Sequence, residues 1–475
     1  MILRPKTFKW LKTGAHNIRT GPLRSTPGSI LMSCGQRGYR SLANLKLGIW
    51  RVAMQNTLAQ EIYIIDETLR DGEQAPGVCF SYKEKVKLIE TMEEAGIDIV
   101  DVGLPIVSLN EAKNIKNILS RKWRIKLAVS IRAKKQDVDV ALNCGAREAF
   151  LFTPVSDLHL QYKFNTSRQQ AEERALQSVE YAVQNGLIVD FVAEDTARAD
   201  LDFIIPLFDR VARAGADKII ICDTVSVLTP AGIKDLCLTI KNRMKETMRF
   251  GIHCHNDFGL ATANTLAAIE AGVEYPTLTV NGIGERAGNA SLEEVVMAAG
   301  NLLKVKHHIK TDMLYVLSKL VEDYSGLIIA PNKSIVGYNA FRHESGIHVD
   351  GILKNLETYE PIRPEEVGRE RAFVLGKHSG RSLVRRLLEE KGIDAKAAEV
   401  DRIVADVKKE KESDSKGAFQ FMKNIVEVFN QKHLGFDERV FWNIVQRVLD
   451  SSRKSEQKGI ASKYLETKRS LYAAE

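Results

Sequence analysis

The stretch RFGIHCHNDFGLATANTLAAIEAG, residues 249–272, predicts a β-strand and an α-helix joined by a polar turn. Its opening apolar run is typical of a strand, and Leu260 to Ala271 has the apolar spacing of a helix. His253 and His255 lie two positions apart in the predicted strand, so both imidazoles leave from the same face. They also lie at a strand-to-helix junction, which is where α/β proteins place their chemistry.

The same pairing of strand and helix recurs from Glu61 onward, at intervals of roughly 25 to 35 residues. The predicted strands are IYIIDET, IDIVDVGL, IKLAVSI, EAFLFTPV, IVDFVAED, KIIICDT, RFGIHCHN and YPTLTVNGIG. Such alternation calls for parallel strands with helical crossovers. Eight units match a (β/α)₈ TIM barrel, whereas a doubly wound sheet usually has fewer strands. We therefore expect an α/β fold, with a TIM barrel at residues 61–305 and mainly helical subdomains at 306–475.

Basic residues are concentrated at the start of the chain. The net charge is +7, but residues 1–60 hold ten of the 68 Lys and Arg and no Asp or Glu. The remaining residues carry 58 basic and 61 acidic side chains, a net charge of −3, so the predicted barrel is not a basic nucleic-acid-binding body. No apolar run approaches the roughly 18 residues that span a bilayer, and we expect no membrane partner.

The leader, residues 1–55, is rich in Arg, Lys, Ser and Thr and lacks a continuous apolar segment. This pattern is typical of a transit peptide for a mitochondrion or plastid rather than of a secretory signal. The alternatives are a disordered basic tail or an upstream extension with Met54 as the start, in which case we expect a cytoplasmic protein. The six cysteines show no CxxC and no regular spacing, and we expect reduced, mostly buried thiols.

Polar residues end nearly every predicted strand, and in a barrel the carboxyl ends of the strands assemble the active site. The strand ends are Asp66-Glu67-Thr68, Asp101, Glu194-Asp195, Asp223-Thr224, His253-Cys254-His255 and Asn281. The first strand continues as DETLRDGEQAPG, which places Arg70, Asp71, Glu73 and Gln74 over the barrel mouth.

These residues could form a metal site. One carboxylate and two imidazoles would leave positions open on a divalent ion. We expect Asp71, His253 and His255 as the ligands, with Asp66 or Glu67 as alternatives to Asp71. The open positions would suit the ketone and one carboxylate oxygen of a 2-oxo acid, with the ion as a Lewis acid. Arg70 could stabilise the alkoxide that forms when the ketone is attacked.

The motifs DETLRDGEQAPG, GIHCHNDFGLATANTLAAIEAG, NGIGERAGNASLEEVV and FRHESGIHVDGILKN resemble the acetyl-CoA-dependent 2-oxo acid acyltransferases, namely 2-isopropylmalate, homocitrate and citramalate synthases. The resemblance covers roughly residues 61–380. It implies a homodimeric enzyme that condenses acetyl-CoA with a 2-oxo acid, using Mg, Mn or Zn.

The resemblance also implies roles for individual residues. Asn289 would join Asp71, His253 and His255 as a metal ligand or close neighbour, and Arg70 would be the catalytic arginine. Four residues are expected to contact the oxo acid, namely Arg70, Gln74, Glu194 and Thr224. Glu194 is also expected to have a catalytic role.

The family's helical subdomain supplies a His and a Tyr, commonly to the active site of the partner protomer. The resemblance points to His348 and Tyr359, whereas the residues alone do not choose between His343 and His348. His348 would help remove a proton from the acetyl methyl group, because an imidazole pKa near 6.5 suits a general base at neutral pH.

A glycine-rich loop follows the eighth predicted strand, with Gly282, Gly284 and Gly288. It forms either a tight turn at the barrel rim or a contact with coenzyme A.

The choice of oxo acid stays open in the sequence. The stretch DVGLPIVSLNEAKNI does not match the usual pocket sequence of any one member of the family. The tail is expected to be helical, without a leucine-binding regulatory domain. The HVDG sequence resembles the homocitrate branch. A barrel lyase acting on 3-hydroxy-3-methylglutaryl-CoA shares the HxH pair and is the alternative enzyme. An RNA-binding protein is the non-enzymatic alternative and rests on the leader alone.

Overall fold

The computed structural model describes residues 57–413, 417–433 and 438–452. The predicted leader, and with it the choice between transit peptide and Met54 start, lies outside these residues. None of the helices among these residues combines the length and the apolar composition that a membrane span requires. Cys79 is exposed, whereas Cys144, Cys222, Cys237 and Cys254 are buried free thiols.

Eight parallel strands close into a barrel in sequence order, which confirms the predicted fold. The pairing of the first strand with the eighth, Ile65 with Thr277 and Asp66 with Leu278, closes the ring. The strands are β1 (Ile65–Asp66), β2 (Ile99–Asp101), β3 (Lys126–Arg132), β4 (Glu148–Pro154), β5 (Ile188–Glu194), β6 (Lys218–Asp223), β7 (Arg249–Cys254) and β8 (Tyr275–Leu278).

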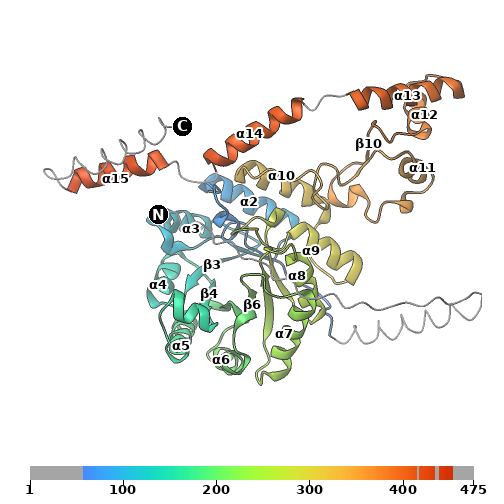
Figure 1. Ribbon diagram of the computed structural model, residues 1–475. Coiled ribbons are helices and arrows are strands. Elements are labelled where there is room, and N and C mark those ends of the chain that lie inside the picture. The colour runs from blue at the N-terminus through green and yellow to red at the C-terminus, as the bar shows by residue number, and fades with distance from the viewer. Residues whose placement is uncertain (1–56, 414–416, 434–437, 453–475) are drawn as a thin grey trace, which may run out of the picture. The chain divides into compact units, whose positions relative to one another are not determined.

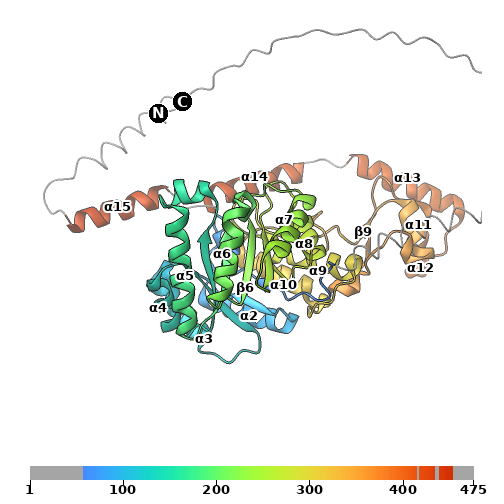
Figure 2. The same ribbon diagram turned by 90° about the horizontal axis from the view of Figure 1, so that it is seen from below.

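Helices follow the strands and cover the outside of the barrel (Figures 1 and 2). They are α2 (Tyr82–Ala95), α3 (Leu109–Leu119), α4 (Lys135–Cys144), α5 (Arg168–Gln184), α6 (Leu201–Arg213), α7 (Pro230–Arg243), α8 (Ala261–Glu270) and α9 (Leu292–Ala298). Local sequence sets their ends. Ser81 and Glu84 form a capping box at the start of α2, and Gly96 ends this helix with a left-handed φ of 85°.

Two layers of apolar side chains hold the barrel together. The larger layer lies between strands and helices, where fully buried residues such as Ile64, Leu88 and Phe208 pack. The smaller layer fills the inside of the barrel and includes Ile65 and Phe150. The barrel is therefore a packed core, and only its ends are open to chemistry.

A buried ion cluster lies at the amino-terminal ends of the strands. Lys218, the first residue of β6, places Nζ 2.9 Å from each of Glu148 Oε1, Asp190 Oδ1 and Asp217 Oδ2. Residues at this end of a TIM barrel serve stability, because the active site forms at the opposite end.

A mainly helical region follows the barrel, as predicted. Its helices are α10 (Leu314–Ser325), α11 (Gly346–Lys354), α12 (Arg381–Glu390), α13 (Ala397–Ser413), α14 (Gly417–His433) and α15 (Glu438–Ser452), and β9 (Arg342–His343) pairs with β10 (Ala372–Phe373). The stretch from 331 to 380 contains α11 and this two-stranded sheet. The charged run KKEKES forms the last turns of α13.

Candidate metal centre and active site

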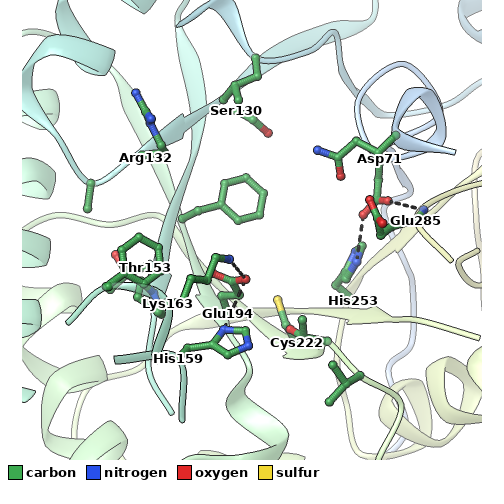
Figure 3. A pocket seen from close by; sticks show the side chains of 18 of the residues that line it. Asp71, Ser130, Arg132, Thr153, His159, Lys163, Glu194, Cys222, His253 and Glu285 are labelled. Atoms are coloured by element: carbon green, nitrogen blue, oxygen red, sulfur yellow. Dashed lines mark hydrogen bonds and ion pairs between the residues drawn. The ribbon is translucent and has the colours of Figure 1, made fainter. Parts of the chain in front are cut away.

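A cavity of about 630 Å³ opens at the carboxyl ends of the strands, where the sequence predicts the site. Figure 3 shows Asp71 and His253 on one side of it, with Lys163, His159 and Glu194 on the opposite side. Residues that line the cavity include Arg70, Asp71, Gln74, Ser130, Arg132, Phe152, His159, Lys163, Arg174, Glu194, Cys222, Thr224, His253, His255 and Arg286.

Asp71, His253 and His255 come together as a buried triad. The Nε2 atoms of the two imidazoles lie 3.1 Å apart. Asp71 Oδ2 lies 3.4 Å from His253 Nε2 and 3.7 Å from His255 Nε2. One possible ligand atom from each of the three residues lies within 4.8 Å of the other two, an arrangement that can hold a metal ion. The geometry thus favours Asp71 over Asp66 and Glu67 as the carboxylate ligand.

The outer nitrogen of each imidazole has its own partner. His253 Nδ1 lies 2.8 Å from Thr277 Oγ1 and 3.2 Å from Glu67 Oε2. His255 Nδ1 lies 3.3 Å from the Gly288 carbonyl oxygen. A proton on each Nδ1 leaves both Nε2 lone pairs facing the triad, which is the tautomer that suits a metal ligand.

Asn289 stands beside the triad with an unused oxygen. Its Nδ2 donates to the Ile283 carbonyl oxygen at 3.2 Å, while its buried Oδ1 has no hydrogen-bond partner among the described residues. Gly284 allows this close approach, because a Cβ there would lie 3.1 Å from Asp71 Oδ1 and would overlap the Asn289 amide. The orphaned oxygen fits the predicted role of Asn289 as a further ligand.

Arg70 contacts three carboxylates, one of which, Asp71, belongs to the triad. Its guanidinium forms an ion pair with Glu67 and lies 3.2 Å from Asp71 Oδ2 and 3.4 Å from Asp101 Oδ2. The same group lies 4.9 Å from the centre of the Phe152 ring. Burial disfavours its charge, but the carboxylates outweigh that cost and raise the pKa of Arg70.

The charges of the site shift the pKa values of its members. Burial opposes ionisation of Asp71, yet Arg70 and the two histidines hold its pKa well below the usual value. Burial likewise opposes the charge on His253, but Glu67 and Asp71 raise its pKa to about 9. Burial and the neighbouring His253 lower the pKa of His255 to about 4. His253 can therefore carry a proton on both of its ring nitrogens, whereas His255 stays neutral and keeps a free lone pair on Nε2.

The opposite wall of the cavity contains Glu194, paired with Lys163 Nζ at 2.6 Å and with His159 Nδ1 at 3.5 Å. The next residue, Asp195, has a left-handed φ of 66°, and its N–H donates to Thr224 Oγ1 at 2.9 Å. Glu194 and Thr224 thus both line the cavity as predicted, and the strained backbone at Asp195 turns the chain directly after Glu194.

Two predicted residues lie elsewhere. His348 and Tyr359 stack with ring centres 4.0 Å apart, both are exposed, and neither lines the cavity of its own chain. Gln74 does line the cavity, as an exposed residue at its rim.

Three of the polar strand ends have structural roles instead. Asp66 accepts from Thr68 N–H and Oγ1, Asp223 accepts from backbone N–H groups of the next loop, and Asn281 donates to the Ser318 carbonyl oxygen. The glycine loop forms a tight turn, since a Cβ at Gly288 would overlap the Gly282 carbonyl oxygen, and its contact with coenzyme A stays a prediction.

Sequence reasoning missed several lining residues, namely Ser130, Arg132, Phe152, His159, Lys163, Arg174, Cys222 and Arg286. Arg132 ends β3 and Phe152 lies near the end of β4, so the strand-end rule could have found both. His159 and Lys163 lie after β4 in a short π-helix over these same residues, and their polar character was the available signal in the sequence.

The comparisons with known proteins agree with this geometry. Residues 61–321 match the HMGL-like family, and residues 335–415 match the homocitrate synthase post-HMGL domain-like family. The chain is 44% identical to a 2-isopropylmalate synthase of Sulfurisphaera tokodaii over 77% of this chain and 95% of that one. It is 43% identical to a homocitrate synthase of Methanothermobacter thermautotrophicus over 74% of this chain and 89% of that one.

A solved structure supports the fold alone. The HMG-CoA lyase of Bacillus subtilis matches with a TM-score of 0.52 and 18% identity, over 57% of this chain and 96% of that one. The family match covers more than half of the sequence, and the two synthases align over most of their own length. The chain therefore belongs to the HMGL-like family, as an acyltransferase of its 2-isopropylmalate and homocitrate synthase group.

Proposed function

We propose that this enzyme condenses acetyl-CoA with a 2-oxo acid at the carboxyl end of the barrel, with the help of a divalent metal ion. The observation that carries the proposal is the contact of Arg70 with Asp71, whose carboxylate faces both imidazole Nε2 atoms. A buried cation beside a metal-binding triad suits a reaction in which negative charge develops on a carbonyl oxygen.

Asp71, His253 and His255 would hold the ion, with Asn289 Oδ1 as a fourth ligand. A divalent ion held there supplies Lewis acidity to the ketone of the bound oxo acid. Arg70 stabilises the alkoxide oxygen that forms from this ketone. Glu194 and Thr224 orient the oxo acid from the opposite wall, and Gln74 contacts it from the rim.

We propose that His348 and Tyr359 act in the cavity of a second copy, because neither lines the cavity of its own chain. His348 removes a proton from the acetyl methyl group, and the resulting enolate carbon attacks the ketone carbon. Hydrolysis of the thioester then releases coenzyme A and drives the reaction forward. This arrangement makes the active enzyme a homodimer.

The candidate oxo acids are 2-oxoglutarate, 2-oxoisovalerate and pyruvate. They would give homocitrate, 2-isopropylmalate and citramalate, respectively. The similar identities to a homocitrate synthase and a 2-isopropylmalate synthase support either product. The test is thiol release from acetyl-CoA with pyruvate, 2-oxoisovalerate, oxaloacetate and 2-oxoglutarate, followed by mass spectrometry of the product. Cleavage of 3-hydroxy-3-methylglutaryl-CoA without any condensation would favour the lyase alternative instead.

We further propose that residues 1–55 direct the protein to a mitochondrion or plastid. The ten basic residues and the absence of acidic residues in this segment support the proposal. Fusion of residues 1–55 to a fluorescent protein tests it, and diffuse cytoplasmic fluorescence would contradict it.

A further inference from the structure

A lysine and two glutamates meet behind the loop that carries Arg70 and Asp71. Lys85, in the first turn of α2, is fully buried, and its Nζ lies 2.7 Å from Glu73 Oε2 and 2.6 Å from Glu111 Oε1. Burial alone would lower the pKa of Lys85, but the two carboxylates raise it above its usual value. The side chain therefore stays charged inside the protein.

Glu73 connects this lysine to the metal-binding loop. It lies in a short 3₁₀ turn, Gly72–Gln74, two residues after Asp71. Its second oxygen, Oε1, accepts from the Phe80 N–H at 2.8 Å. The two oxygens of Glu73 thus connect the 3₁₀ turn in the middle of the loop with Phe80 at its end and with Lys85.

Glu111 packs against the loop that follows the second strand. Gly103 has a φ of 125°, and a Cβ there would lie 2.7 Å from Glu111 Oε1. The Gly103 N–H donates to Asp101 Oδ1 at 3.0 Å, and the other oxygen of Asp101 lies 3.4 Å from Arg70 Nε. Lys85 therefore reaches the surroundings of Arg70 on two sides: through its ion pair with Glu73 in the loop after β1, and through Glu111, which packs against Gly103 in the loop after β2.

We infer that Lys85 is a positioning residue that fixes the β1 loop, and with it Asp71 and Arg70, against the loop after β2. Without its charge, Glu73 and Glu111 would face each other as unpaired carboxylates, and partly buried carboxylates without a cation are costly. Glu73 would turn toward solvent and displace the 3₁₀ turn that follows Asp71. This role rests on the metal site proposed above.

A second buried lysine offers a matched control. Lys218 also pairs with buried carboxylates, but it begins β6, five residues and about 16 Å from the carboxyl end of that strand. Loss of either lysine should lower the melting temperature. Only loss of Lys85 should disturb the metal site, so the comparison separates positioning from general stability.

The experiment compares Mn²⁺ binding by wild type, Lys85→Met and Lys218→Met after removal of bound metal. We expect titration calorimetry to give a Kd about 10- to 100-fold higher for Lys85→Met, as for other residues that orient ligands, and an unchanged Kd for Lys218→Met. Equal affinities in the three proteins would overturn the inference. A wild-type chain that binds no Mn²⁺ would instead count against the proposed metal site.

Hydrogen exchange of the metal-free proteins tests the inference without any ion. We expect faster exchange in residues 68–80 of Lys85→Met, and wild-type exchange in the same segment of Lys218→Met. Unchanged exchange in Lys85→Met would overturn the inference. If either lysine variant does not fold, Glu111→Gln and Asp190→Asn replace the pair, because each weakens one of the two ion clusters while the lysine stays in place.

Discussion

The Nε2 atoms of His253 and His255 lie 3.1 Å apart and face each other, while each Nδ1 has a partner on the far side of its ring. Two lone pairs at this distance repel unless a proton or a cation lies between them. Together with Asp71 they form the centre on which the proposed chemistry depends.

This arrangement predicts that a divalent ion stabilises the folded protein. Addition of Mn²⁺ or Zn²⁺ to chelator-treated wild type should raise the melting temperature, because a ligand that binds only the folded state stabilises it by mass action. His255→Ala should abolish the shift. A control at the other end of the barrel, Asp190→Asn, should retain it, and a wild-type shift in His255→Ala would contradict the assignment.

Arg70 is predicted to act on the transition state. Replacement by Gln should lower kcat about 100- to 1000-fold, as expected for the loss of one group that stabilises a developing oxyanion. The KM for acetyl-CoA should change little, since the proposal assigns Arg70 to the oxo acid. Steady-state kinetics with the preferred oxo acid measures both constants, and a kcat close to that of wild type would contradict the role.

The placement of His348 outside its own cavity predicts complementation between subunits. Arg70→Gln and His348→Ala should each be inactive alone. After unfolding and refolding together in equal amounts, random pairing in a symmetric dimer should restore about a quarter of wild-type activity, because half of the dimers contain one intact site. A mixture as inactive as its components would show that His348 does not serve the partner's site.

Asp66 predicts a pH-dependent contribution to stability. Burial raises its pKa to about 7, although the Thr68 hydrogen bonds oppose the shift. The folded state therefore holds the proton more tightly than the unfolded state, and the stability from this group is present below about pH 4 and lost as the pH rises through 7. From pH 5 to pH 8, wild type should lose about 2–3 kcal/mol relative to Asp66→Asn. Chemical denaturation at both pH values tests this, and a constant difference would contradict it.

The fold and the centre of the site are readable from the sequence because they depend on local patterns. Alternating strands and helices predict the barrel, and the barrel rule brings strand seven and the β1 loop to one end. That rule predicts His253, His255 and Asp71 at the site. It does not choose among Asp66, Glu67 and Asp71 as the carboxylate ligand. That choice depends on contacts in the folded protein, because Asp66 accepts hydrogen bonds from Thr68 N–H and Oγ1, and Glu67 faces the outer nitrogen of His253.

Other features depend on contacts between distant residues and leave little trace in sequence. Lys85 lies among charged residues of an amphipathic helix and reads as a surface lysine, yet Glu73 and Glu111 bury its charge. His159 and Lys163 become part of the site only because the loop after β4 meets Glu194 on β5. Such pairings follow from the packing of loops and not from periodicity.

The most direct test of the proposed chemistry is thiol release from acetyl-CoA by purified enzyme, before and after removal of bound metal by a chelator. We predict release that requires one of the four 2-oxo acids, stops on chelation and returns when Mg²⁺, Mn²⁺ or Zn²⁺ is added. Absence of release with every acid, or release that chelation leaves unchanged, would contradict a metal-dependent condensation at Asp71, His253 and His255.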